Sequence, residues 1–239
     1  MKFLTDKQAG VKVTPLFEDE VYDSKLLEYT KEKELFSGKI KEVYTNLPFD
    51  GEKEILLGLG KKEELVEDKV REVFFKLVKA LVKNKELEVY VTLPKVNNIL
   101  TEKFVNAAVE GALHGTYKFD KYKSDRKEFP EITINLSTEE KLDNLEEVVN
   151  EACDVMSGVF FSRDLVNERA EYLYPETLAN IASKELSALG VEVEVYDEKQ
   201  CEELGLKGLL AVGRGSDRKP RFIVMKYLNN PEESEVVGL

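Results

Sequence analysis

Residues 55–93 decide the fold class and read ILLGLGKKEELVEDKVREVFFKLVKALVKNKELEVYVTL. The compact apolar run Ile55–Leu57 predicts a buried strand, which we expect to end in a turn at Gly58–Gly60. Between Leu87 and Leu93 apolar and polar residues alternate, as in a half-buried strand. Between these strands, apolar residues recur every three or four positions and mark one face of a helix: Val66, Val70, Val73, Phe74, Leu77, Val78, Leu81 and Val82. The segment predicts the strand–helix–strand unit of an α/β fold.

The alternation of strands and helices continues beyond this segment. A second helical stripe covers residues 104–113, and Ile132, Ile134 and Leu136 predict another strand. Ser137 lies three residues before Glu140, the spacing of a capping box, and predicts that a helix begins there. Its apolar face would consist of Leu142, Leu145, Val149, Ala152, Cys153, Met156, Val159 and Phe160. Residues 1–158 are therefore expected to form an α/β sandwich, although the first fifty residues show no clear pattern.

A second α/β unit is predicted over residues 159–239. Pro175 suits the first turn of a helix, and Gly190 suits the position after its end. Strands are expected at Val191–Val195, at the apolar run Leu209–Val212 and at Arg221–Tyr227. The pattern of residues 159–239 is typical of the first part of an α/β domain, and the sequence shows no sign of the rest of that domain.

The last four residues, Val236–Leu239, resemble the start of a buried strand. Natural chain ends are more often polar and frayed. The pattern therefore favours an artificial boundary, a split gene or an interrupted reading frame, and all three explanations stay open.

The composition indicates a soluble cytoplasmic protein. Of the 239 residues 42% are apolar and 34% charged, which is enough apolar material for a packed core. No stretch approaches the roughly 20 apolar residues that cross a bilayer, and the N-terminus lacks the apolar core of a secretory signal. Cys153 and Cys201 fit no zinc or redox spacing. The net charge of −12 is spread along the chain, which argues against binding to nucleic acid.

Two glycine-containing segments could cradle a phosphate group. Gly58–Gly60 follows a strand, but position 63 is a glutamate where the dinucleotide fingerprint has its third glycine. A simple turn is therefore favoured over a nucleotide site. Gly213–Ser216 also follows a predicted strand, and its Arg214 could hold a carboxylate or phosphate. Because another strand pattern comes next, a strand-to-strand turn is favoured there.

The remaining candidates also favour structural roles. Tyr117–Lys123 interleaves aromatic residues with lysines, as single-strand nucleic-acid platforms do, but we favour aromatics that anchor a connection to the core. His114, the sole histidine, lies at the end of a helix pattern, where a cationic side chain interacts well with the helix dipole. Cys153 reads as a small buried apolar residue. From the residues alone, no catalytic, cofactor-binding or metal-binding residue is assigned.

Several segments, in collinear order, resemble the leucyl (cytosol) aminopeptidase family. They are ILLGLG at 55–60, EGALHGTYKFDKYKS at 110–124, FSRDLVN at 161–167 followed by YPETLA at 174–179, and GLLAVGRGS at 208–216 followed by PRFIVM at 220–225. The resemblance covers the chain from about residue 40 onward. One departure lies at residues 168–171, Glu-Arg-Ala-Glu, where the family usually has a proline and then an asparagine.

The resemblance implies a macro-domain-like three-layer sandwich as an accessory domain over 1–158, and the start of a catalytic domain over 159–239. It further implies a full-length parent that removes N-terminal residues from peptides with two divalent metals, manganese or zinc, and that assembles as a homohexamer. The family's metal-ligand blocks, Gly-Lys-Gly leading to Phe-Asp-Ser-Gly-Gly and Asn-Thr-Asp-Ala-Glu-Gly-Arg, do not occur in this sequence. We therefore expect this chain to be inactive alone and to have a structural, oligomerisation role. The alternative is a stand-alone macro-like module that binds a nucleotide-type small molecule such as ADP-ribose.

Overall fold

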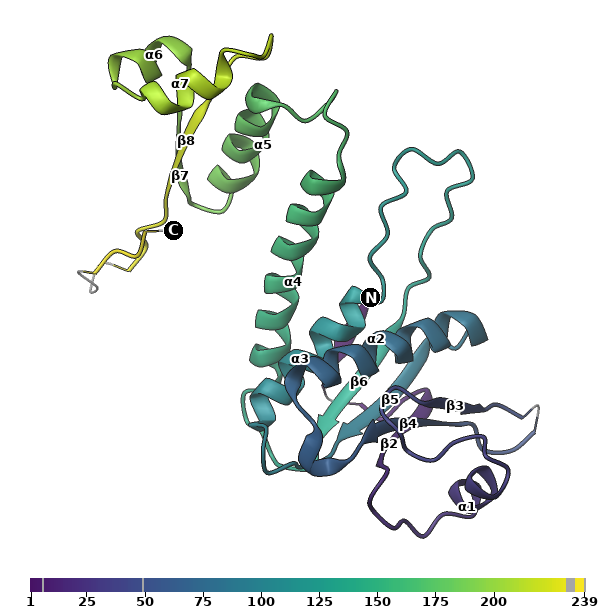
Figure 1. Ribbon diagram of the computed structural model, residues 1–239. Helices are drawn as coiled ribbons and strands as arrows, with labels where there is room; N and C mark the ends of the chain where they lie inside the picture. The colour runs from purple at the N-terminus through teal and green to yellow at the C-terminus, as the bar shows by residue number, and fades with distance from the viewer. Residues whose placement is uncertain (6, 49, 231–234, 239) are drawn as a thin grey trace. The chain divides into compact units, whose positions relative to one another are not determined.

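The computed structural model describes residues 1–239 except 6, 49, 231–234 and 239 (Figure 1). The chain divides into two compact units, Met1–Arg163 and Asp164–Leu239. This division and the domain boundary expected after residue 158 both fall within one helix, α4 (Leu145–Asn167).

The first unit is built on a largely parallel sheet. Its described strands are ordered β1-β6-β5-β2-β4-β3. Neighbouring strands run parallel except at β3–β4, where the edge strand β3 is antiparallel. The strands are β1 (Lys2–Leu4), β2 (Val11–Phe17), β3 (Val43–Asn46), β4 (Glu54–Gly60), β5 (Glu88–Leu93) and β6 (Thr133–Thr138). The α/β class is the one that the sequence predicts.

Helices cover both faces of this sheet (Figure 1). Alternate residues of a strand point to opposite faces. One set, which includes Val13, Ile55 and Leu57, packs in one core with α2 (Glu67–Asn84), α3 (Thr101–His114) and the first half of α4. The other set packs with α1 (Lys25–Glu32) in a second core of Leu16, Leu27, Phe36 and Leu56. A short 3₁₀ helix, η1 (Lys62–Glu64), links β4 to α2.

The turn predicted at Gly58–Gly60 is wrong, because both glycines continue β4. Their hydrogen bonds run to the segment before β3: the Gly58 amide donates to the Glu42 carbonyl at 2.8 Å and the Gly60 amide to the Gly38 carbonyl at 2.9 Å. A Cβ at Gly58 would lie 2.1 Å from the Lys39 carbonyl oxygen. Glycine is therefore required here by the close approach of two backbones.

Gly58→Ala is expected to destabilise the chain by about 1–3 kcal/mol, since a side chain forced against backbone must displace it. Urea denaturation followed by circular dichroism measures the change. The control is Gly158→Ala, because a Cβ at Gly158 would meet nothing within 4 Å, and alanine in a helix is favoured over glycine by about 0.5–1 kcal/mol. Equal stability of wild type and Gly58→Ala would contradict the steric explanation.

The helix predicted to begin at Ser137 starts later. Ser137 lies in β6, where its hydroxyl lies 2.8 Å from that of Thr92 in a hydrogen bond. The ladder between β5 and β6 extends to Leu93 and Thr138. Ser137 therefore takes part in strand pairing and does not cap a helix, and α4 begins at Leu145.

The second unit contains α5 (Pro175–Ser187), β7 (Glu192–Tyr196), α6 (Glu198–Glu203), α7 (Lys207–Gly213) and β8 (Phe222–Lys226) among its described residues. Pro175 begins α5 as predicted. Gly190 adopts a left-handed conformation (φ +83°) shortly after the end of α5. β7 and β8 pair antiparallel, and they account for the strands predicted at 191–195 and 221–227.

Two strand predictions in this unit are wrong. Leu209–Val212 lies in helix α7, where the Arg214 amide donates to the Leu210 carbonyl at 3.1 Å. A run of four apolar residues is compatible with either structure, and Val212 is 87% exposed. Residues 235–238 are not in a strand, and Val236 and Val237 are exposed. Leu239 lies outside the described residues.

Candidate functional site

The carboxyl edge of the parallel sheet is the place where α/β proteins usually bind ligands, at the point where successive connections lead in opposite directions. Here the connection from β2 leads toward β4 and that from β5 leads toward β6, so this point lies between β2 and β5. The strands end at this edge with Phe17, Gly60, Leu93 and Thr138. The residues that follow them form the candidate site.

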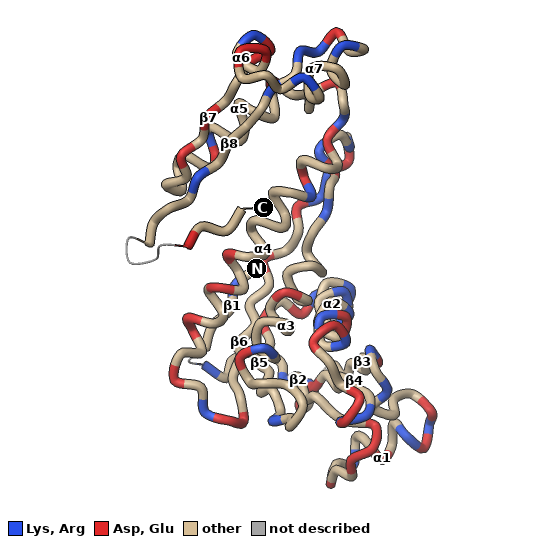
Figure 2. Tube along the Cα trace, turned by 60° about the vertical axis from the view of Figure 1, so that its left-hand side comes forward, with Lys and Arg blue, Asp and Glu red and all other residues tan. Residues whose placement is uncertain are grey.

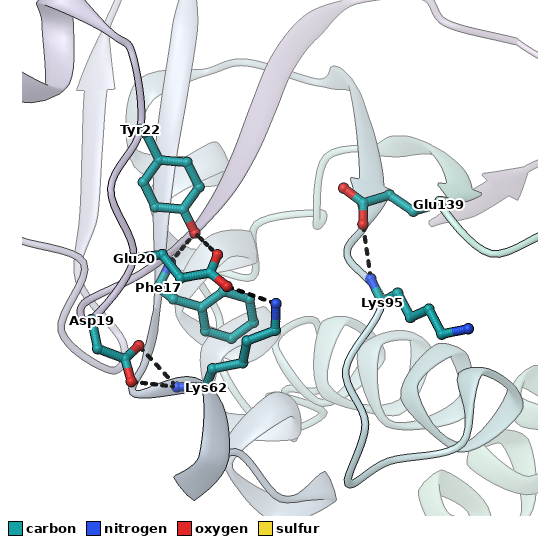
Figure 3. A network of polar contacts seen from close by, with 7 residues as sticks. All are labelled: Phe17, Asp19, Glu20, Tyr22, Lys62, Lys95 and Glu139. Carbon is teal, nitrogen blue, oxygen red and sulfur yellow. Dashed lines mark hydrogen bonds and ion pairs between the residues drawn. The ribbon is translucent and has the colours of Figure 1, made fainter.

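Lys62 ties together the loops after β2 and β4 (Figure 3). Its Nζ donates to the Glu20 carboxylate at 2.6 Å and lies 5.2 Å from the centre of the Phe17 ring. Its backbone amide donates to Asp19 at 3.1 Å. The Tyr22 hydroxyl donates to Glu20 and accepts from the Phe17 amide, each at 2.8 Å. The lysine lowers the pKa of Glu20, and burial raises the pKa of Tyr22.

A second network joins the loops after β5 and β6 (Figure 3). The Lys95 amide donates to Glu139 at 3.0 Å, and the Lys95 ammonium pairs with Glu140 at 2.6 Å. The Thr101 hydroxyl at the start of α3 also donates to Glu140. These contacts lower the pKa of Glu140. In both networks a lysine is paired with a carboxylate, so their charges neutralise each other. These contacts hold neighbouring loops together at the carboxyl edge of the sheet.

The nucleotide reading of Gly58–Gly60 does not fit this geometry. A phosphate cradle needs free backbone amides that converge on one point. The amides of Gly58 and Gly60 already donate within the sheet region. Basic and acidic residues are also interspersed along both units (Figure 2), in keeping with the net charge of −12.

His114 is the last residue of α3, as the helix pattern predicts. Its Nδ1 lies 3.2 Å from an Arg163 guanidinium nitrogen in a hydrogen bond. Because the guanidinium can only donate, this ring nitrogen accepts and carries no proton. Burial, and then the charge of Arg163, lower the histidine pKa. The expected cationic partner of the helix dipole is therefore a neutral imidazole.

A groove of about 350 Å³ borders His114 and is lined by Lys41, Arg71, Glu72, Phe75 and Lys76. Its charges are mostly paired within the protein. Lys41 contacts Glu72 at 2.7 Å, and Arg71 contacts Glu110 at 2.5 Å. The groove thus combines the Phe75 ring with charged side chains that are mostly paired within the protein.

The segment Tyr117–Lys123 behaves partly as predicted. Tyr117 packs on Phe160 with ring centres 5.1 Å apart, so it anchors the connection to α4. Asp120, which is 9% exposed, pairs with Lys118 at 2.5 Å and with Arg126 at 3.3 Å. Tyr122 is exposed. Both ion pairs lie within this loop. They pair Lys118 and Arg126 with Asp120, so these two cations are not free to bind the phosphates of a nucleic acid.

The remaining candidates, Gly213–Ser216 and the two cysteines, lie in places where structural roles account for them. Gly213 ends helix α7 and lies against Pro220, so Gly213–Ser216 joins a helix to a strand instead of two strands. Cys153 is half-buried beside the core, and burial raises its pKa. Cys201 is fully buried.

No group of three or more His, Cys, Asp or Glu side chains among the described residues could hold a metal ion. The described part of the chain therefore contains no such cluster for the two metals that the resemblance implies. No described helix is both long and apolar enough to cross a membrane.

Comparison with known families matches both parts of the chain. The N-terminal domain of the cytosol aminopeptidase family matches residues 9–126, and its catalytic domain matches residues 160–239. The chain is 45% identical to a probable cytosol aminopeptidase of Treponema denticola over 100% of its length and 50% of that protein. It is 37% identical to one from Clostridium tetani, over 100% of this chain and 51% of the relative. It thus spans about half the length of these curated relatives.

Solved structures show the same fold at low sequence identity. A tomato leucine aminopeptidase mutant has a TM-score of 0.78 at 20% identity, covering 93% of this chain and 50% of that one. The bottromycin maturation enzyme BotP in complex with Mn has a TM-score of 0.76 at 24% identity, covering 92% and 45%. These comparisons do not support the alternative of a stand-alone macro-like module. With two domains of one family matched in order and close relatives along its whole length, the chain belongs to the cytosol aminopeptidase family, whose N-terminal part it represents.

Proposed function

We propose that this chain provides the accessory domain and the entrance to the catalytic domain of a metal-dependent aminopeptidase. The whole enzyme would remove N-terminal residues from peptides in the cytoplasm, using two divalent metals, manganese or zinc. The metals would activate water and polarise the scissile carbonyl. The observation that carries this proposal is the match of both family domains in their natural order.

In this proposal the chain itself has a structural role. Residues 1–158 would form the accessory domain and residues 159–239 the start of the catalytic one, with the boundary inside α4. The metal ligands would come from the half of the relatives that this chain does not match. Folding, subunit contacts in a homohexamer and access to the active site would be the contributions of this part.

Exposed apolar side chains in the second unit support this role. An isolated two-stranded sheet is only marginally stable in water. Near the β7–β8 pair, Phe222 is 39%, Met225 56%, Tyr227 65% and Leu228 63% exposed. We propose that the remainder of a catalytic domain covers these side chains.

A chimera tests the proposed function. The chain alone, incubated with manganese and leucine p-nitroanilide, is expected to give no turnover. The chain fused to the unmatched half of the Treponema denticola relative is expected to hydrolyse this substrate at least about 100-fold faster than the chain alone, because it would regain a two-metal site. Chelation by EDTA should remove that activity.

The intact Treponema denticola protein serves as the positive control for folding and metal loading. Robust metal-dependent turnover by the chain alone would refute a purely structural role. A folded chimera without activity, beside an active control, would refute the proposed contribution to the enzyme.

A further inference from the structure

Helix α4 carries a continuous packed stripe to the edge of the first unit. Val149, Ala152 and Met156 are buried, and they follow one another at three- and four-residue spacing. Phe160 and Arg163 extend this stripe with the same spacing and are half-buried. The first unit ends at Arg163, whereas α4 continues to Asn167. Phe160 and Arg163 therefore occupy the last part of α4 that is held by the first unit.

Four side chains meet at this point. The Arg163 guanidinium lies 3.9 Å from the centre of the Tyr117 ring, within the range of a cation–π contact. Phe160 contacts both Tyr117, at 5.1 Å, and His114, edge-on at 6.3 Å. The hydrogen bond between Arg163 and His114 Nδ1 closes the cluster. α4 is thus joined to the end of α3 and to the loop that follows it.

The cluster depends on a neutral imidazole. Protonation of His114 would remove the acceptor of the arginine hydrogen bond and place two positive charges 3.2 Å apart. Burial, Arg163 and Arg71 lower the pKa of His114 and Glu110 raises it, and the net direction is downward. Glu110 on α3 is held by Arg71 of α2, and Glu72 of α2 is held by Lys41. Lys76, which lines the groove beside His114, adds a further positive charge.

We propose that His114, Tyr117, Phe160 and Arg163 form a pH-sensitive clamp, which fixes residues 156–163 of α4 to the end of α3 and to the loop that follows it while His114 is neutral, and releases them when His114 is protonated. The clamp would control how firmly the helix that leads into the second unit is held. Its histidine is the only one in the chain, so a single group accounts for the switch.

The direction of the pH effect follows from linkage. The histidine pKa in the folded chain lies below its ordinary value of 6.5, with burial and Arg163 as the main causes. The unfolded chain then binds more protons between the two pKa values, so stability rises with pH in that interval. The contribution of the clamp is fully present above pH 6.5 and is lost as the pH falls through the folded pKa.

Nuclear magnetic resonance and hydrogen exchange of the full chain test the clamp. The single imidazole signal should titrate below pH 6.5 in wild type and move toward 6.5 in Arg163→Ala. After correction for intrinsic exchange rates, protection of amides 157–165 should fall at least about threefold between pH 7.5 and pH 5.0. Arg163→Ala should show the lower protection already at pH 7.5.

His114→Asn keeps a neutral acceptor near the position of Nδ1 and should abolish the pH dependence of α4 protection. Arg163→Lys, which keeps the charge but loses the planar stacking group, should weaken protection without unfolding the chain. Arg218→Ala is the matched control, since Arg218 stacks on Tyr174 at 4.0 Å within the second unit. A wild-type titration at or above 6.5 would overturn the proposal, as would pH-dependent protection that persists in His114→Asn.

Discussion

Gly111→Val is expected to destabilise the first unit by at least about 3 kcal/mol, because two helices would have to separate. Gly111 lies on α3 where this helix crosses α2. A Cβ at this position would lie 2.2 Å from the Arg71 carbonyl oxygen and 2.6 Å from the Arg71 Cα. These are backbone atoms of a helix, so no side-chain rotation can relieve the overlap.

The separation would extend through the main core. Phe74 of α2 and Phe104 of α3 belong to one cluster of buried side chains with the strands. Each atom pair that moves apart loses part of its dispersion attraction. A typical domain has only about 5–15 kcal/mol of total stability, so partial or complete unfolding is expected. Urea denaturation monitored by circular dichroism measures the effect.

Gly158→Val provides a matched comparison, because that glycine also lies in a helix but its Cβ would meet nothing within 4 Å. Its stability is expected to stay within about 0.5 kcal/mol of wild type, as for an exposed helix position. A Gly111→Val chain with the wild-type urea midpoint would show that α2 and α3 are not in close backbone contact.

Residues 66–93 and 104–113 could be predicted because their structure follows local periodicity. The stripe from Val70 to Leu81 appears in α2 with these residues buried. The first fifty residues gave no such signal. Pro15 lies inside β2, paired with Leu57, although proline lacks the amide that a central strand uses. Strand β2 is therefore defined by its neighbours β4 and β5 and not by its own sequence pattern.

The candidate site could not be predicted because its contacts are distant in sequence. Lys62 and Glu20 are separated by 42 positions and Lys95 and Glu140 by 45. No local spacing rule joins such pairs. Gly58 and Ser137 show the related problem that a good local motif can be overridden by a neighbouring strand or segment. Family resemblance identified the family correctly, since it depends on whole blocks of sequence.

Asn135 is a buried polar residue whose role no local sequence pattern predicts. It is 1% exposed in the centre of β6. Its Nδ2 donates to the Ala9 carbonyl at 2.9 Å and to the Val89 carbonyl at 3.2 Å. The side chain therefore ties the connection before β2 to the middle of the sheet, where water does not compete for the hydrogen bonds.

Asn135→Asp is expected to cost at least about 3 kcal/mol at pH 7.5, because it places a buried carboxylate against two carbonyl oxygens. Burial raises the pKa of such a carboxyl above its unfolded value of about 3.9. The folded chain then binds more protons, so the deficit relative to wild type is largest above the folded pKa and shrinks as the pH falls toward 4. Urea midpoints of variant and wild type at pH 7.5 and 4.5 give this difference.

Asn144→Asp, at an exposed asparagine that contacts Glu102, should change stability by no more than about 0.5 kcal/mol at either pH. A deficit for Asn135→Asp that grows on acidification would mean that its carboxylate has found donors, and that the two carbonyls do not define this site.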